Sequence, residues 1–255
     1  MIRVGLSSQA LLTRSPSEVL ALAKAAGLDG VEWAGEAHVP TGDGAAQDRL
    51  LMDTLRAGLT VASIASLYRV TPGAEQGLGF ESLLAGAVRL QAPVLRVYAG
   101  ALPAARLSPA EREALRGELS RLGDLAGKRG VTICLSLGRN TSLDNYAAAI
   151  GVVEGAAHPF VRLAWEPLPG VEAAKATAAL ESAARGVGLL LAKRSDRDGK
   201  GGPLSEEGEA WRLRLEAYRR GEGDPAMGRF VLLGRVGEDD EGRLREDAAF
   251  LRSLA

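Results

Sequence analysis

The first residues that could do chemistry stand together in the stretch 27–40, which reads Gly-Leu-Asp-Gly-Val-Glu-Trp-Ala-Gly-Glu-Ala-His-Val-Pro. It holds a carboxylate at Glu32 and an imidazole at His38, two side-chain types that often transfer protons in enzymes. The run 30–33 has the pattern of a short buried strand, so Glu32 lies near the carboxyl end of that strand. A carboxylate at this place favours a functional site over a core position. For His38, the alternative is a loop residue hydrogen-bonded to its own turn.

Other apolar runs of the chain also end in polar residues. Glu166 supplies a second carboxylate. Four cations also follow or end such runs: Arg96, Lys193, Arg194 and Arg235. Several cations on one face favour an anionic ligand, such as a phosphate or carboxylate held by forked arginine contacts.

Each of these residues also has a structural explanation. Lys193 and Arg194 could form a solvated loop, and Arg96 could be the buried ion-pair partner of a carboxylate. Three aromatic residues complete the set of candidate ligand contacts: Tyr68, Tyr98 and Trp165. For Tyr98 and Trp165, and for the carboxylates, the alternative is that they are polar or aromatic parts of the scaffold.

Strand patterns alternate with helical patterns along the sequence. Two helices are expected to begin with the phrase Ser-Pro-x-Glu, at 15–18 and 108–111, where serine caps the helix and proline takes its first position. The expected strands are 3–7, 30–33, 60–66, 94–98, 132–137, 161–165, 188–192 and 229–233. The expected helices are 15–26, 47–57, 80–90, 108–129, 142–154, 171–184, 206–220 and 244–254.

This alternation predicts an α/β fold, a single (β/α)₈ TIM barrel spanning residues 1–255. Near-continuous apolar strands are typical of parallel sheets that helices cover on the outside. An open doubly wound sheet is the alternative, but no G-x-G-x-x-G pattern follows the first strand. In a barrel, active sites lie at the carboxyl ends of the strands, so the candidate residues are expected to meet on one face.

Composition narrows the range of partners. With 31 basic and 32 acidic residues, the chain has no overall field that would draw it to nucleic acid or to a membrane. Apolar runs stay below about 18 residues and the start lacks a basic signal region, so we expect a cytoplasmic protein. The single cysteine, Cys134, fits a reducing compartment and is interpreted as a small buried strand residue. The expected partner is a small anionic or sugar-like ligand, and the oligomeric state stays open.

Four phrases carry a resemblance to a known superfamily. They are 27–33 (Gly-Leu-Asp-Gly-Val-Glu-Trp), 38–40 (His-Val-Pro), 96–100 (Arg-Val-Tyr-Ala-Gly) and 158–162 (His-Pro-Phe-Val-Arg). Nearly the whole chain resembles the xylose isomerase-like TIM-barrel superfamily, and its sugar phosphate isomerase/epimerase branch most closely. The resemblance implies a sugar-converting barrel with a divalent metal held by carboxylates and a histidine. The metal would polarise an oxygen while a carboxylate moves a proton.

The sequence departs from this superfamily at the metal ligands. Ser136 and Gly234 stand where the resemblance implies glutamates on the fifth and eighth strands, and the seventh strand has no histidine. Of the four implied ligands only Glu166 remains. One carboxylate does not make a Mg²⁺ or Mn²⁺ site, so we expect no metal cofactor. A ligand set of Glu32, His38 and Glu166 is the alternative.

Two hypotheses of function follow. In the first, the chain is a metal-independent sugar or sugar-phosphate isomerase or epimerase. Glu32 or Glu166 takes a proton next to a carbonyl, His38 or Lys193 returns one, and a strand-end arginine stabilises the enediolate. In the second, a degenerate barrel binds a carbohydrate-like anion without turnover, as a sensor or accessory protein. A three-zinc DNA endonuclease would need many more histidines and a basic surface.

Overall fold

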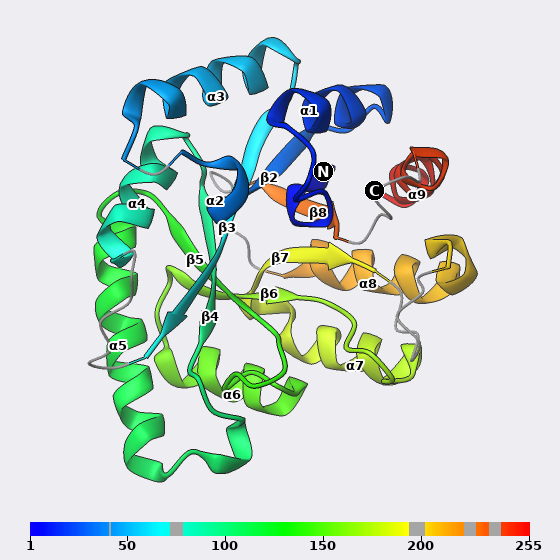
Figure 1. The fold of residues 1–255 in the computed structure, drawn as a ribbon. Coiled ribbons are helices and arrows are strands. Elements are labelled where there is room, and N and C mark those ends of the chain that lie inside the picture. The colour runs from blue at the N-terminus through cyan, green and yellow to red at the C-terminus, as the bar shows by residue number, and fades with distance from the viewer. Residues whose placement is uncertain (41, 72–78, 194–201, 222–227, 235–240) are drawn as a thin grey trace.

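The computed structural model describes residues 1–40, 42–71, 79–193, 202–221, 228–234 and 241–255. Its parallel strands pair in chain order and close into a barrel, with the helices around the outside (Figure 1). The predicted fold class is confirmed. The strands are β1 (Ile2–Ser7), β2 (Gly30–Ala34), β3 (Thr60–Val70), β4 (Val94–Ala99), β5 (Thr132–Ser136), β6 (Val161–Trp165), β7 (Val187–Ala192) and β8 (Arg229–Leu233).

The α-helices lie between and after these strands. They are α1 (Pro16–Ala25), α2 (Gly35–His38), α3 (Gly44–Arg56), α4 (Phe80–Arg89), α5 (Pro109–Gly127), α6 (Tyr146–Ala156), α7 (Ala173–Ala183), α8 (Gly208–Arg220) and α9 (Glu241–Leu254). Short 3₁₀ turns occupy Ser8–Ala10, Ala104–Arg106, Ala184–Gly186 and Leu204–Glu207.

The expected capping boxes are present at both Ser-Pro-x-Glu phrases. In each, the serine hydroxyl accepts from the backbone of the glutamate, and the glutamate carboxylate accepts from the backbone of the serine. Gly27 follows the end of α1 with φ of +65°, a conformation that glycine adopts without strain. Local signals of this kind therefore set where α1 and α5 begin and where α1 ends.

Most predicted boundaries agree with the structure within three residues, and the two largest differences, of four residues each, concern β3 and α6. The third strand was expected to end at residue 66, but β3 continues to Val70. The helix expected over 142–154 is α6, which begins at Tyr146 because the Asn145 side chain caps it by accepting from the backbone of Ala148. The helix expected over 206–220 is divided into the 3₁₀ turn Leu204–Glu207 and α8.

Inside the barrel, small and large side chains complement one another. A cluster of buried apolar residues fills the lumen: Ala62, Val94, Cys134, Ala164, Leu189, Leu191, Phe230 and Leu232. A side chain at Gly30 would come within 2.9 Å of the Phe230 ring, and one at Gly5 within 3.3 Å. The two glycines therefore leave the room that the Phe230 ring needs. Cys134 is fully buried here, as predicted, and burial raises its thiol pKa to about 12.

The first and last strands close the barrel directly. β1 pairs with β8 from Ile2 opposite Arg229 to Leu6 opposite Leu233. Because every strand runs parallel to its neighbours, the carboxyl ends of all strands lie on one side of the barrel. The residues that end or follow the strands thereby share one face. Within the part of the chain that the structure describes, no helix is long and apolar enough to cross a membrane.

Candidate functional site

The centre of the strand-end face is an ion pair between Glu32 on β2 and Arg96 on β4. The Nε of Arg96 donates to Oε2 of Glu32 at 2.8 Å, and its Nη2 donates to Oε1 at 2.7 Å. This two-bond geometry is the strongest arrangement of an arginine with a carboxylate. The Glu32 side chain has no exposed surface and that of Arg96 is 5% exposed. Of the explanations that the sequence left open for Arg96, the buried ion pair is the one that the structure contains.

Further side chains complete the hydrogen bonding of this pair. Ser7 of β1 donates to Glu32 at 2.6 Å, and Ser63 of β3 donates to it at 2.7 Å. On the arginine side, Nη2 donates to Gln9 at 2.6 Å and Nη1 donates to Ser136 at 3.0 Å. Four of the five N–H groups of Arg96 are therefore occupied by described residues, and the fifth has no partner among them.

Both members of the pair are held in their charged forms. Burial alone would raise the pKa of Glu32, but the charge of Arg96 and the hydrogen bonds from Arg96, Ser7 and Ser63 outweigh it and lower that pKa. Burial alone would lower the pKa of Arg96, but the Glu32 carboxylate, with smaller contributions from Tyr98 and Glu166, raises it. A carboxylate bound in this way is a weak base, because taking a proton would leave a buried guanidinium unpaired.

A register shift explains how Ser63 reaches Glu32. The β2–β3 ladder pairs Val31 with Val61 but Glu32 with Ser63, so one extra residue of β3 is accommodated between the two pairs. Such an irregularity changes which side chain faces the partner strand. Ser63 was not among the residues predicted from the sequence. A serine within an otherwise apolar strand was the only signal for it.

A second ion pair joins the ends of β6 and β7. The Nζ of Lys193 lies 2.8 Å from Oε1 of Glu166, and the two side chains are 17% and 16% exposed. The buried cluster in the lumen includes Ala164 and Leu191, which precede Glu166 and Lys193 by two residues each. Side chains alternate along a strand, so Glu166 and Lys193 continue the inward-facing rows of β6 and β7. Unlike Glu32 and Arg96, this pair is in contact with solvent.

His38 lies in a different environment from the two ion pairs. It ends α2 and is 4% exposed. Its Nε2 lies 2.9 Å from the carbonyl oxygen of Arg14, and its Nδ1 lies 2.8 Å from the hydroxyl of Ser8. A carbonyl only accepts, so Nε2 donates to Arg14, and Nδ1 is hydrogen-bonded to the hydroxyl of Ser8. Both ring nitrogens are therefore used in tying the segment after β2 to the segment after β1, and not in the hydrogen bond to its own turn that the sequence left open as the alternative.

The three aromatic candidates are placed differently. Tyr98 is half-buried beside the central ion pair, and the guanidinium of Arg69 lies 5.4 Å from its ring centroid. Tyr68 packs against Phe80 of α4, on the outside of the barrel, at a centroid distance of 5.7 Å. Trp165 is fully buried on the outer side of β6. Its ring stacks on that of Tyr146 of α6 at a centroid distance of 5.9 Å, and the guanidinium of Arg214 of α8 lies 5.6 Å from its centroid. Of the three, Tyr98 is the one that adjoins the ion pairs.

Tyr146 was not predicted as a site residue, yet it holds the segment that carries Glu166. Its hydroxyl donates to the carbonyl of Glu166 at 3.2 Å and accepts from the backbone of Leu168 at 2.8 Å. Burial raises the pKa of Tyr146 to about 12, so the hydroxyl keeps its proton for this bond. The ring stacks on Trp165, which fixes it between α6 and β6.

The described residues do not supply a ligand set for a divalent metal. Among them, no group of three or more His, Cys, Asp or Glu side chains lies close enough together to hold an ion. The oxygens of Glu32 already accept hydrogen bonds from protein groups, and Glu166 contacts a lysine. A Mg²⁺ or Mn²⁺ ion needs several free oxygen ligands around one point. The predicted cations Arg194 and Arg235 lie outside the described residues.

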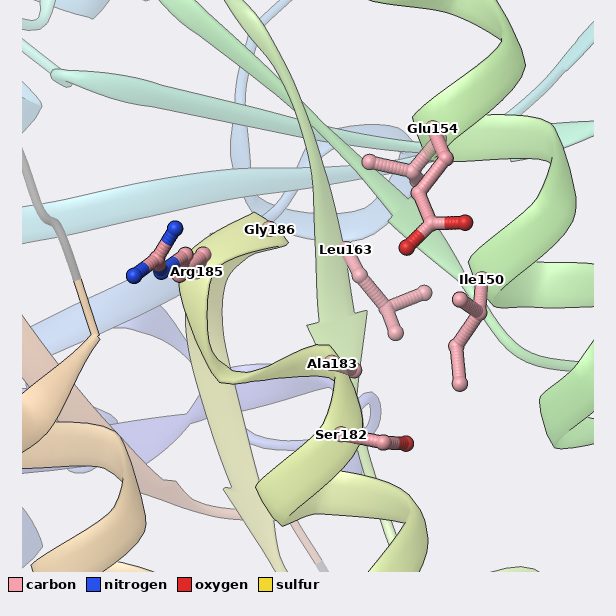
Figure 2. Close-up of a pocket in the computed structure, with 8 residues that line it drawn as sticks. Ile150, Glu154, Leu163, Ser182, Ala183, Arg185 and Gly186 are labelled. Carbon is pink, nitrogen blue, oxygen red and sulfur yellow. The ribbon is translucent and has the colours of Figure 1, made fainter.

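The cavities described in the structure lie away from these residues. One, with a volume of about 150 Å³, lies between α6 and α7 near the amino ends of β6 and β7. Figure 2 shows the Arg185 side chain at its rim pointing away from the Glu154 carboxylate. Another, of about 360 Å³, is lined by Leu102, Leu115 and Ser142 beyond the end of β4. Neither contains a predicted site residue.

Comparison with known proteins gives matches in structure alone. No protein-family model and no curated protein sequence matches the chain. A probable 3-DHS dehydratase from Bacillus anthracis matches with a TM-score of 0.78 at 14% identity, covering 99% of each chain. A 3-keto-D-glucoside 4-epimerase from E. coli matches with a TM-score of 0.72 at 18% identity, covering 99% of this chain and 100% of that one.

A third solved structure has a name that describes its fold. It is a xylose isomerase-like TIM barrel protein from Mycobacterium smegmatis, in complex with magnesium, and it matches with a TM-score of 0.70 at 17% identity. The match covers 100% of this chain and 98% of that one. At these identities the likeness concerns the fold.

Proposed function

We propose that this chain, which has the xylose isomerase-like TIM-barrel fold, acts on a small carbohydrate-like carbonyl compound and moves a proton on the carbon next to the carbonyl. The groups that move the proton are Glu166 and Lys193. One observation carries the proposal: this pair combines a 2.8 Å contact with partial exposure at the strand-end face. The likeness in fold to a solved 3-keto-D-glucoside 4-epimerase supports a reaction of the isomerase or epimerase class.

The roles follow from the two ion pairs. Glu166 takes the proton from carbon, because its carboxylate has solvent access and, among the described residues, gives up its contact with Lys193 to act as a base. Lys193 donates to the carbonyl oxygen and so stabilises the charge that develops there. Glu32 and Arg96 form a second, buried ion pair, and Arg96 lies near enough to Glu166 to interact with its charge. In this proposal no divalent metal takes part, since the described donors do not fit one.

The substrate class is a small sugar or sugar acid, with or without a phosphate. Lys193 and the remaining N–H of Arg96 favour a ligand with an anionic or hydroxyl oxygen. The ring of Tyr98 offers an apolar edge beside the Glu32–Arg96 pair, which suits the C–H face of a sugar.

A direct test is exchange of carbon-bound hydrogen with solvent. The protein is incubated in D₂O with a panel of ketoses, aldoses, sugar acids and sugar phosphates, and deuterium uptake is followed by NMR. We expect uptake next to the carbonyl of at least one compound, and a loss of roughly 10²-fold or more in Glu166→Gln, the range typical of a lost general base. Lys175→Met removes a surface lysine and serves as the matched control.

A second candidate function is binding of the same class of ligand without turnover. It is favoured by Glu32, because a carboxylate saturated by four hydrogen bonds has no base function left. Binding without turnover predicts thermal stabilisation by a sugar or anion of the panel and no deuterium uptake. Uptake that is unchanged in Glu166→Gln would overturn the proposed catalytic role of the pair. An absence of both uptake and stabilisation would overturn both functions.

A further inference from the structure

One polar side chain at the strand-end face is held in place and still has hydrogen-bond donors to spare. Gln9 lies in the 3₁₀ turn Ser8–Ala10 directly after β1, and its Oε1 accepts from Nη2 of Arg96 at 2.6 Å. A guanidinium can only donate, so the amide oxygen has to be the atom that faces Arg96. The orientation of the whole amide group follows, and its nitrogen points away from that contact.

The amide nitrogen of Gln9 is accessible from solvent. It has no hydrogen-bond partner among the described residues. In the same part of the chain, the ring nitrogens of Trp33, Trp165 and Trp211 are buried without a partner, but Nε2 of Gln9 is not buried in this way. A fixed amide therefore presents its N–H groups to whatever occupies the end of the barrel.

The surroundings of Gln9 are those of the proposed site. Tyr98 of β4 and Glu166, which follows β6, both lie near enough to Arg96 to interact with it electrostatically. Gln9 contacts the same guanidinium from the end of β1. Three strands on different sides of the barrel thus bring a polar side chain to Arg96, and each of these side chains is only partly buried.

We propose that Gln9 is a specificity-determining residue, whose amide N–H groups donate to an oxygen of the substrate and so help to place it beside the Glu166–Lys193 pair. The inference rests on the proposed function and deepens it by adding a residue that reads the substrate. A neutral amide N–H accepts no bond, so its partner is an acceptor oxygen, which a carbonyl, a hydroxyl or a carboxylate provides. Gln9 selects the position of that oxygen.

A chain of hydrogen bonds holds the turn that carries Gln9. The hydroxyl of Ser8 accepts from the backbone N–H of Ala34 at 2.8 Å and is hydrogen-bonded to Nδ1 of His38 at 2.8 Å. His38 in turn donates to the carbonyl of Arg14 at 2.9 Å. A donor that is already held in one place loses little freedom when a ligand binds. Ser8 and His38 therefore act on binding through Gln9, as positioning residues.

The structural alternative is that Gln9 only completes the hydrogen bonding of Arg96. That role uses the amide oxygen alone, and a glutamate would fill it as well, because its carboxylate also accepts from a guanidinium. The N–H groups are what substrate binding requires in addition. Gln9→Glu keeps an oxygen for Arg96 and removes these donors, so it separates the two roles.

A double-mutant cycle between protein and ligand tests the inference. The full-length protein is titrated with D-fructose, its monodeoxy analogues and D-gluconate, and binding is followed by NMR of the ligand. We expect Gln9→Met to weaken binding of D-fructose by roughly two- to tenfold, the range for one net hydrogen bond. One deoxy analogue should bind the parent protein more weakly by a similar factor, and should bind Gln9→Met as well as D-fructose does.

Two further variants complete the design. Gln9→Glu should match Gln9→Met with the neutral probes and should weaken D-gluconate further, because a carboxylate at this place repels an anion. Gln91→Met is the matched control, since Gln91 is exposed and precedes β4 at the opposite end of the barrel. It should leave every affinity unchanged.

The results separate this inference from the proposed function. Unchanged affinity in Gln9→Met, or equal losses for every deoxy analogue in both proteins, overturns the role of Gln9. If deuterium uptake still depends on Glu166 in that case, the proposed function stands. Coupling of Gln9 to one ligand oxygen without any deuterium uptake supports the inference and removes the proposed proton transfer. If the parent protein binds none of these probes, the inference falls, whatever the uptake with other compounds.

Discussion

At the scale of single residues, the Glu32–Arg96 pair makes each partner necessary for the other. Changing Arg96 to methionine removes the forked contact and leaves a fully buried carboxylate with only two serine hydroxyls as donors. We expect a loss of about 3 to 5 kcal/mol in the free energy of unfolding at neutral pH, because an unpaired buried charge is costly. Urea denaturation measures it. The double variant Glu32→Leu/Arg96→Met should lose less than Arg96→Met alone, and a larger loss would contradict this explanation.

The same pair gives a pH dependence with a definite sign. In the parent, the pKa of Glu32 is lowered, so its contribution to stability is present above about pH 4.3, the unfolded value, and is lost as pH falls through the folded value. In Arg96→Met, burial dominates and raises that pKa above the unfolded value. The variant then loses stability as pH rises from about 4.3 towards the raised pKa. The difference in stability between parent and variant should therefore be larger at pH 8 than at pH 5. A difference that does not change with pH would show that lost packing, not charge, explains the effect.

The residue types at the site could be predicted, but not all of their partners. The sequence placed Glu32, Arg96 and Glu166 at strand ends and named an ion pair as one role for Arg96. It did not indicate Ser63, because the two-residue alternation of a strand is interrupted by the shift between β2 and β3. Nor did it indicate Tyr146, whose role depends on how α6 packs beside β6. A pattern along one strand carries no information about packing across two elements.

At the scale of elements, close packing inside the barrel leaves no room for a side chain at Gly5 of β1 or at Gly30 of β2. A Cβ at Gly30 would lie 2.7 Å from the Thr60 carbonyl and 2.9 Å from the Phe230 ring. Because the carbonyl belongs to the backbone of β3, Gly30→Ala forces strands apart, and we expect about 1 to 3 kcal/mol of destabilisation. The matched control is Gly151→Ala on α6, where a Cβ meets nothing within 4 Å and helix propensity should make the change neutral or stabilising. Equal melting temperatures for the two variants would contradict this account.

The elements themselves were largely predictable because their signals are local. Proline at the first helical position, a serine cap and a glycine with positive φ each act within one turn, and both capping boxes were found where the phrase occurs. The extension of β3 to Val70 was not predictable, since β3 pairs with β4 as far as Val70 opposite Ala99 and this pairing is a property of two strands.

At the scale of the whole molecule, metal dependence is the clearest property to test. The described residues do not provide a set of three acidic, histidine or cysteine ligands. We expect EDTA to leave the melting temperature unchanged, and Mg²⁺ or Mn²⁺ to raise it only at concentrations where they act as general salts. Binding to the native state alone would stabilise it by about 2.7 kcal/mol at a hundred times the dissociation constant, which differential scanning calorimetry would detect. A saturable shift that disappears in Glu166→Gln would show that this carboxylate holds an ion.

The closing ladder between β1 and β8 also bears on how the chain is made. β1 leaves the ribosome long before its five ladder partners on β8, residues 229–233. Until those residues emerge, the growing sheet has two open edges, one on β1 and one on the most recently synthesised strand, and open edges invite pairing with other chains. The nascent barrel therefore remains an incomplete sheet until residues 229–233 are available. Ribosome-bound fragments that end before residue 229 should be sensitive to proteases and to crowding, and should gain resistance only when the eighth strand has been released.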